Sequence, residues 1–221
     1  MLIPTAITQQ ADPNTDGWVN DINNTWTYVS ASTFTVSGDR TIVFSKGTRL
    51  RWTQTTVKYG VVVDSSYSAP NTTVTIAVNN DYTLANAAIT NNYYSYAANP
   101  QGYPDFFNYT PTFGGFSGTP VLNAVRFSVL GKLCCYLIFP DPTTSNATSL
   151  TFTVPIISSN SASTQTFVGA RVVNNGTASA SPGYMELPAS SSTAAAYRDG
   201  TGTLWTASGT KMWAARFFYE I

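Results

Sequence analysis

Carboxylates are the side chains of this sequence with the most capacity for chemistry, because the chain has no histidine. That absence removes the commonest general base and metal ligand, and with them Ser-His-Asp and Cys-His catalysis. Two carboxylates about 5 to 10 Å apart could still hydrolyse a glycosidic bond. Glu186 and Glu220 are the only glutamates, however, and the nine aspartates are expected mostly in turns. Four of them stand beside Gly, Ser or Pro: Asp39, Asp64, Asp141 and Asp199. We expect these aspartates to bond nearby backbone, and we expect no enzyme, although carboxylates from different subunits could meet.

Neither metal nor cofactor binding is predicted. Cys134 and Cys135 are the only cysteines, and a zinc site would need more cysteines than this chain has. Because they are adjacent, their Cα atoms stand about 3.8 Å apart, and on a strand their side chains point to opposite faces. We expect two small buried hydrophobic side chains, with an interchain bridge as the alternative. Residues 12–16 resemble the start of a calcium loop but lack the glutamate that should follow.

The composition predicts a folded chain that does not bind nucleic acid. With 43% hydrophobic residues, including 12 Phe, 13 Tyr and 5 Trp, the 221 residues can build a substantial core, in one large all-β domain or in two of about 100 residues. Eleven Lys and Arg balance eleven Asp and Glu. Residues 1–5 lack the features of a secretory signal, and no apolar run approaches the roughly 20 residues that span a bilayer. We therefore expect synthesis in a cytoplasm and no membrane insertion.

Alternation of apolar and polar residues predicts antiparallel strands, for example at residues 33–36, 49–52 and 73–78. Residues 133–139 are apolar on both faces, which indicates a central sandwich strand or one whose outer face another subunit covers. Asn175-Gly176 is a hairpin signal. The single helical candidate is Ala-rich and spans residues 81–89. The dense aromatic residues of a last strand, 211–221, predict a buried C-terminus.

The predicted fold class is all-β, with two antiparallel β-sandwich or barrel-like domains preceded by an extended N-terminal arm. Residues 1–25 are polar and aperiodic and form the expected arm. Residues 26–108 form a first β module, and residues 109–221 form a jelly-roll-like β-sandwich. The boundary is placed between residues 105 and 120, where Pro and Gly are too frequent for a strand or helix to continue.

Aromatic side chains are the candidate contact residues, because amphipathic rings are enriched at protein interfaces and can stack on sugars. A tyrosine-rich stretch runs from Tyr93 to Tyr109. We expect it to pack between the two domains; the alternatives, in order, are a subunit or capsid contact and glycan binding. In the arm we expect anchoring to a particle, and in the last strand a trimer core. The candidates in these three places are Ile3, Trp18, Tyr93, Tyr94, Tyr96, Tyr103, Phe107, Tyr109, Trp213, Phe217 and Tyr219.

The only basic cluster is expected to make ion pairs, to the arm or to an adjacent subunit. Strand alternation places Trp52 on the face opposite Arg49 and Arg51, whereas a nucleic-acid site needs aromatic rings and positive charge on one face. The members of the cluster are Arg40, Lys46, Arg49, Arg51 and Lys58.

Several strings of the sequence resemble virion proteins of tailed bacteriophages and prophages. The first half is similar to a small β module of such proteins at residues 26–39 (WTYVSASTFTVSGD), 46–54 (KGTRLRWTQ), 57–62 (VKYGVV), 67–74 (YSAPNTTV), 81–86 (DYTLAN) and 99–104 (NPQGYP). The second half resembles, more loosely, the C-terminal β domains of phage fibre proteins at residues 129–132 (VLGK), 144–148 (TSNAT), 152–155 (FTVP) and 218–221 (FYEI). The resemblance covers most of residues 17–221. It implies a role on the virion surface, frequent trimers and no cofactor, and it supplies no catalytic residues.

Three functions are therefore compared. The first is a capsid decoration (cement) or head-fibre protein that assembles as a homotrimer on the phage head, with the major capsid protein or another virion protein as partner. The second is the receptor-binding tip of a tail fibre that recognises host surface glycan, and the third is a glycan-degrading enzyme. The sequence has no coiled-coil, collagen-like or β-helical shaft, which favours the head. The expected location is the virion surface after synthesis in the host bacterial cytoplasm.

Overall fold

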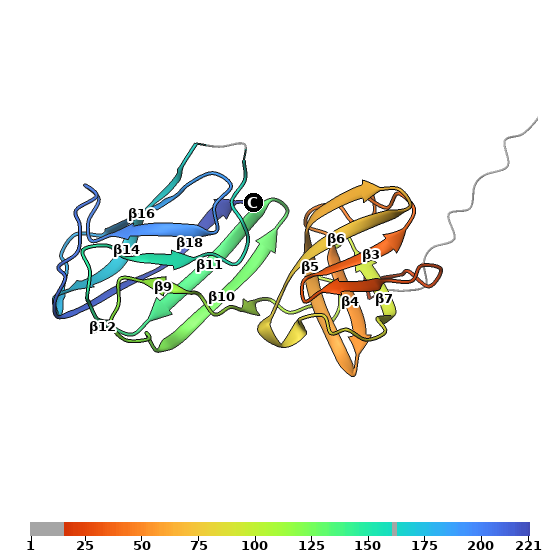
Figure 1. Ribbon diagram of the computed structural model, residues 1–221, viewed down its shortest axis with the longest axis horizontal. Coiled ribbons are helices and arrows are strands. Elements are labelled where there is room, and N and C mark those ends of the chain that lie inside the picture. Colours follow the sequence, from red (N-terminus) through yellow and green to blue (C-terminus); the bar gives the residue numbers. More distant parts are fainter. Residues whose placement is uncertain (1–15, 161–162) are drawn as a thin grey trace, which may run out of the picture.

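The computed structural model describes residues 16–160 and 163–221, which form two β lobes arranged along the long axis of the molecule (Figure 1). Apart from one short 3-10 turn, all regular structure in these residues is strand, and every strand pairing is antiparallel. Within the described ranges there is no helix with the length and apolarity needed to cross a membrane. The predicted fold class, two antiparallel sandwich or barrel-like domains, is confirmed.

The first lobe is a curled sheet with the strand order β1-β7-β4-β5-β6-β3-β2. Its strands are β1 (Val19–Asn20), β2 (Thr27–Ser30), β3 (Thr33–Ser37), β4 (Arg49–Gln54), β5 (Thr56–Ser68), β6 (Asn71–Val78) and β7 (Thr90–Ser95). An isolated bridge between Trp26, just before β2, and Ile89, just before β7, connects the β2 end of this order to its other side, which makes the sheet barrel-like. Alternate residues of β3 and β4, including Phe34 and Trp52, are fully buried in the lobe, as the period-two pattern predicts.

The predicted helix at residues 81–89 is wrong. Only a 3-10 turn, Asn80–Tyr82, forms there, and the chain then continues without helix. The Gln54 side chain explains how the backbone is satisfied, because its amide nitrogen donates to the carbonyl oxygens of Ala85 and Ala87, at 2.9 and 3.0 Å. Its amide oxygen accepts from the Ala85 N–H at 3.1 Å. These bonds replace the helical hydrogen bonds that an Ala-rich segment would otherwise make.

Residues 16–25 belong to the first lobe, which corrects their assignment to an extended arm. Residues 19–20 pair with β7 as an edge strand, and Trp18 is fully buried beside them. The Trp18 indole N–H donates to the carbonyl oxygen of Gln101 at 2.8 Å. The rest of the predicted arm, residues 1–15, lies outside the described residues.

The second lobe is a longer sheet with the order β8-β10-β11-β18-β14-β16-β17-β13-β9, to which β12 and β15 add short pairings with β18 and β14. Its strands are β8 (Phe107–Asn108), β9 (Phe113–Gly114), β10 (Leu122–Leu130), β11 (Leu133–Pro140), β12 (Thr143–Thr144), β13 (Thr151–Thr153), β14 (Gln165–Asn174), β15 (Thr177–Ala178), β16 (Gly183–Leu187), β17 (Thr193–Tyr197) and β18 (Thr210–Glu220). Residues 107–108, assigned to the first module from the sequence, thus pair within the second sheet.

The second sheet folds over its own core. Phe152 on β13 contacts Trp213 on β18 with ring centroids 5.3 Å apart, although these strands lie far apart in the sheet order. The hairpin predicted at Asn175-Gly176 is confirmed between β14 and β15, and both residues have the positive φ (48° and 77°) that a tight I′-type hairpin turn requires. Ile221 is buried, as expected for the C-terminus.

One hydrophobic cluster continues from the first lobe into the second. Val61 and Ala77 of the first lobe pack in the same cluster as Phe127 and the rest of the second core. Tyr103 packs against this cluster, and its hydroxyl donates to the carbonyl oxygen of Gly60 at 3.2 Å. The lobes are therefore joined by packed side chains as well as by the connecting chain.

Candidate functional site

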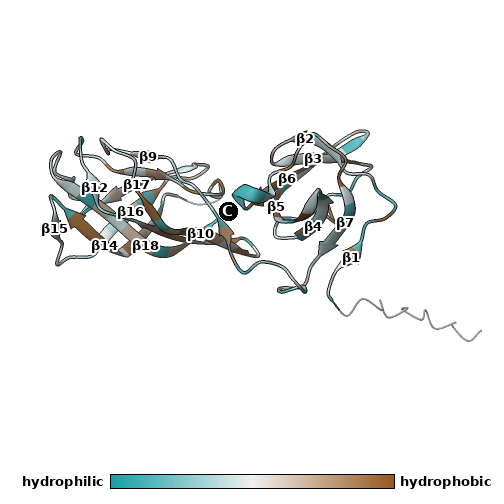
Figure 2. Cartoon of the chain, turned by 90° about the horizontal axis from the view of Figure 1, so that it is seen from below, coloured by the Kyte–Doolittle hydropathy of each residue, from teal (hydrophilic) through white to brown (hydrophobic). Residues whose placement is uncertain are grey.

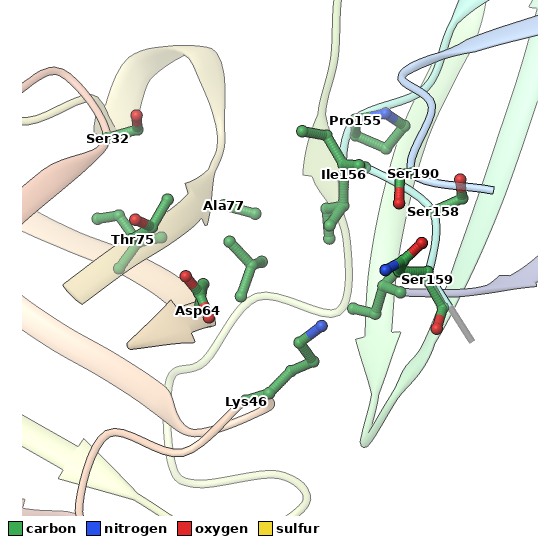
Figure 3. A pocket seen from close by; sticks show the side chains of 15 residues that line it. Ser32, Lys46, Asp64, Thr75, Ala77, Pro155, Ile156, Ser158, Ser159 and Ser190 are labelled. Atoms are coloured by element: carbon green, nitrogen blue, oxygen red, sulfur yellow. The ribbon is translucent and has the colours of Figure 1, made fainter. Parts of the chain in front are cut away.

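A cavity of about 550 Å³ lies between the two lobes and is the first candidate site (Figure 3). Lys46, in the turn before β4, extends its ammonium group from the first lobe into this space, and Asp64 on β5 lies near it. The segment after β13 supplies the opposite wall, with Ile156, Ser158 and Ser159. These residues are more than 90 positions apart in the sequence, so only the packing of the lobes brings them together.

The chemistry of this interlobe cavity is that of a binding site for a small polar molecule. Aliphatic side chains of Val63, Ile76 and Ile156 form part of its lining, together with hydroxyl groups. Neither Lys46 nor Asp64 forms an ion pair with another described residue. Asp64 is the only carboxylate side chain among the lining residues, whereas hydrolysis of a glycoside uses two.

Two of the aspartates predicted in turns do bond nearby backbone, as expected, whereas the turn predicted at Asp64 is wrong, because Asp64 lies within strand β5. Asp199 accepts from the Thr201 N–H and hydroxyl and from the Thr203 N–H, at 2.7 to 3.2 Å. These hydrogen bonds to the charged form lower the pKa of the Asp199 carboxyl to about 2. Asp39 accepts from the N–H and hydroxyl of Thr41 in the same way, and its pKa is also lowered. Both carboxylates are therefore turn-forming groups and poor proton donors at neutral pH.

Two arginines of the basic cluster pair with residues 16–25, as the sequence predicts for the arm. The Arg40 guanidinium lies 3.0 Å from the buried carboxylate of Asp21, and Arg51 lies 3.9 Å from the carboxylate of Asp16. The Arg51 guanidinium also stands over the rings of Trp18 and Tyr93, at 4.9 and 4.1 Å from their centroids. This cluster thus fixes the start of the first lobe to its own sheet.

Glu186, one of the two glutamates on the second sheet, is held between two tyrosines. The hydroxyls of Tyr184 and Tyr197 donate to the two carboxylate oxygens of Glu186, at 2.9 and 3.0 Å. The pKa of both tyrosines is raised, for Tyr184 chiefly by desolvation and for Tyr197 chiefly by the hydrogen bond to Glu186. Both carboxylate oxygens of Glu186 thus accept hydrogen bonds from tyrosines of its own sheet, on β16 and β17.

The adjacent cysteines behave as buried hydrophobic side chains. Both are free thiols; Cys134 faces the core of the second lobe and Cys135 the opposite side of β11. Burial raises the pKa of the Cys134 thiol to about 12 and raises that of Cys135 as well. Among the described residues, no three His, Cys, Asp or Glu side chains lie together in a group that could hold a metal ion.

Several candidate contact residues are buried within one chain, which corrects their expected role. The side chains expected to form a trimer core expose almost no surface, because they fill the interior of the second lobe: Trp213, Phe217 and Tyr219. Trp18 is likewise buried in the first lobe and is not available to anchor the chain to a particle. Ile3 lies outside the described residues.

The tyrosine-rich stretch divides into two groups. Tyr103, Phe107 and Tyr109 belong to or pack against the cluster that continues between the lobes, which is the domain packing weighed first from the sequence. Tyr93 and Tyr94 are half-buried on β7. Tyr96, just after β7, is 60% exposed and remains a candidate contact residue.

An exposed apolar area on the second lobe is the second candidate site, and we call Leu130, Leu133 and Phe218 the outer patch. Their side chains are 58%, 42% and 59% exposed on the face of β10, β11 and β18 that points away from the core. Figure 2 shows apolar colour along much of β10 and β18. Leu130 lines a shallow hollow together with Tyr96, so exposed apolar surface continues toward the first lobe.

The outer patch was only partly predictable. The run at residues 133–139, apolar on both faces, indicated either a central sandwich strand or a strand whose outer face another subunit covers. In the structure it is β11, which lies between β10 and β18. Phe218 was not among the candidates, although period-two alternation places it opposite Phe217 and Tyr219.

Comparison of the chain with protein-family models, with curated proteins and with solved structures gives no match. The resemblance to phage virion proteins therefore stays a prediction from the sequence.

Proposed function

We propose that the chain is a non-catalytic structural protein of a tailed-phage particle, acting as a capsid decoration or head-fibre protein. It holds its place by exposed apolar and hydroxyl-bearing sheet surface. The observation that supports this most is the outer patch, because three large apolar side chains on adjacent strands are costly to leave in water. The structural hydrogen bonds of Asp39, Asp199 and Glu186 agree with this role, because they occupy carboxylates that hydrolysis would use.

The experiment is cosedimentation of purified chain with particles that lack it. The full chain should bind, and a variant without residues 1–15 should fold but bind less. The deletion ends at residue 15 because Trp18 and β1 are needed by the first lobe. Equal binding by the truncated chain would show that residues 1–15 do not contribute to particle binding. No binding by the full chain would reject the proposed function.

A second candidate is the glycan-recognising tip of a tail fibre, and the interlobe cavity favours it. Its hydroxyl groups, with Lys46 and Asp64, could meet sugar hydroxyls. An aromatic platform, which sugars favour, is missing from its lining residues. Binding of the full chain to a host-glycan array, lost in Asp64→Ala and retained in Asp39→Ala, would support this function over the first one.

A further inference from the structure

The outer patch lies in a regular grid set by the register of three adjacent strands. Leu130 of β10 faces Leu133 of β11, which faces Glu220 of β18. The next row on the same face contains Ser128, Cys135 and Phe218, and the row after it contains Arg126, Leu137 and Arg216. Phe218 therefore lies between a row with two arginines and a row in which Leu130 and Leu133 stand beside the carboxylate of Glu220.

The charges on β18 make the two ends of this face different, one cationic and one anionic. Arg216, Phe218 and Glu220 are all exposed and point outward, and four residues of strand separate the two charged ones by about 13 Å. Neither Arg216 nor Glu220 forms an ion pair with another described residue. The Arg216 guanidinium lies 5.9 Å from the centroid of the Phe106 ring, and Arg126 lies 4.7 Å from the same ring, so both cations are held at one end.

We propose that a second copy of this chain covers the outer patch, in a two-fold contact whose axis lies between the two faces and runs across the strands. Such an axis reverses the strand direction of the second copy. Phe218 then faces Phe218 of the other copy, and each Arg216 faces the other copy's Glu220. An axis parallel to the strands would instead place Arg216 opposite Arg216, with like charges opposed.

Along β18 the ring of Phe218 and the charges of Arg216 and Glu220 are thus complementary to the same residues of a second copy. At the centre Phe218 meets Phe218 of the other copy, and on β11 Leu133 meets the other copy's Leu137. On β18 opposite charges meet on both sides of Phe218, as a closed two-fold interface requires, while Leu130 lies opposite the other copy's Arg126. This proposal identifies the partner of the outer patch as a second copy of the chain. It rests on the proposed function only in taking the outer patch to be a contact surface. It joins two copies, so it does not by itself produce the threefold assembly expected from the sequence.

The test is a charge-reversal cycle on the full chain, read as the dimer dissociation constant by sedimentation equilibrium. Arg216→Glu opposes two carboxylates twice in the symmetric dimer, and Glu220→Arg opposes two cations twice. Each should weaken the dimer by about tenfold or more. An equimolar mixture of the two variants should form mixed dimers near wild-type strength, because each contact again joins opposite charges. The double variant R216E/E220R should also recover.

A matched pair of apolar variants separates the patch from general surface effects. Phe218→Ser should weaken the dimer, whereas Leu204→Ser should not, although Leu204, in the loop between β17 and β18, is 56% exposed on the same lobe. A wild-type chain that stays monomeric at every accessible concentration would overturn the proposal. So would single variants that dimerise as well as wild type, or a mixture that fails to recover. Absence of the chain from phage particles would reject the proposed function and leave this dimer measurable.

Discussion

The buried lysine of the second lobe gives a prediction whose size follows from the structure. Lys211 on β18 is fully buried, and its ammonium donates to the carbonyl oxygens of Ala147 and Ser149, at 3.0 and 2.6 Å. None of the described carboxylates forms an ion pair with it. Desolvation disfavours the charged form and lowers the pKa of Lys211 to about 8 from 10.5.

Between these two pKa values the unfolded chain binds more protons than the folded chain, so the free energy of unfolding should rise with pH. For folded and unfolded pKa values of 8 and 10.5, this contribution increases by about 1.4 kcal/mol from pH 7 to pH 9. The buried thiol of Cys134 acts in the opposite direction, because its raised pKa weakens the fold as the unfolded thiol ionises. A comparison with Lys211→Met isolates the lysine, because Cys134 is present in both proteins.

The assay is urea unfolding of wild type and Lys211→Met at pH 7, 8 and 9. The difference between the free energies of unfolding, wild type minus variant, should increase by about 1 to 1.5 kcal/mol from pH 7 to pH 9. A constant difference would show that Lys211 titrates alike in the folded and unfolded chains. A difference that falls with pH would refute the reasoning, because it would require the charged form to be favoured in the fold.

Three further stability predictions concern residues whose role the structure changed or revealed. Trp18→Ala should lower the free energy of unfolding by about 3 to 5 kcal/mol, measured by urea titration. A loss below about 1 kcal/mol would show that Trp18 is not packed in the first lobe and belongs to a surface arm. Phe217→Ala should lower the free energy of unfolding by a similar amount in the same assay. Phe218→Ala, measured at a concentration where the chain is monomeric, should change the free energy of unfolding by about 0.5 kcal/mol or less. Equal effects of the two substitutions would contradict the assigned faces of β18. Gln54→Ala should cost about 1 to 3 kcal/mol by thermal unfolding, because it removes three part-buried hydrogen bonds to the backbone of Ala85 and Ala87. An unchanged midpoint would show that another group, such as water, replaces these bonds at no cost.

The strands and one hairpin could be predicted from the sequence because local signals determine them. Thr33–Ser37 alternates with period two, and one face of that strand is buried, so pattern and burial agree. Asn175-Gly176 accepts positive φ at both positions, which suits a two-residue hairpin turn. The dense aromatic residues of β18 likewise predicted burial of the C-terminus, which the structure confirms.

The errors arose where long-range packing decides the outcome. Residues 81–89 have helical composition, but Gln54, some 30 positions earlier, binds their backbone in another conformation. Trp18 stands in a polar stretch, and its burial depends on contacts with Gln101 and Arg51. The face of β18 that points inward is fixed by the fold, so Phe217 and Phe218 could not be told apart by aromatic content alone. The interlobe cavity combines Lys46 with Ser159, and no local pattern links such distant residues.

We propose above all that this chain is a structural part of a phage particle and acts through its surfaces. The most direct measurement is electron microscopy of purified particles labelled with an antibody against this chain. We predict regular label on the particle head, in a constant number of copies per particle. Purified particles that carry no label, while the free chain cleaves host glycan in solution, would contradict the claim.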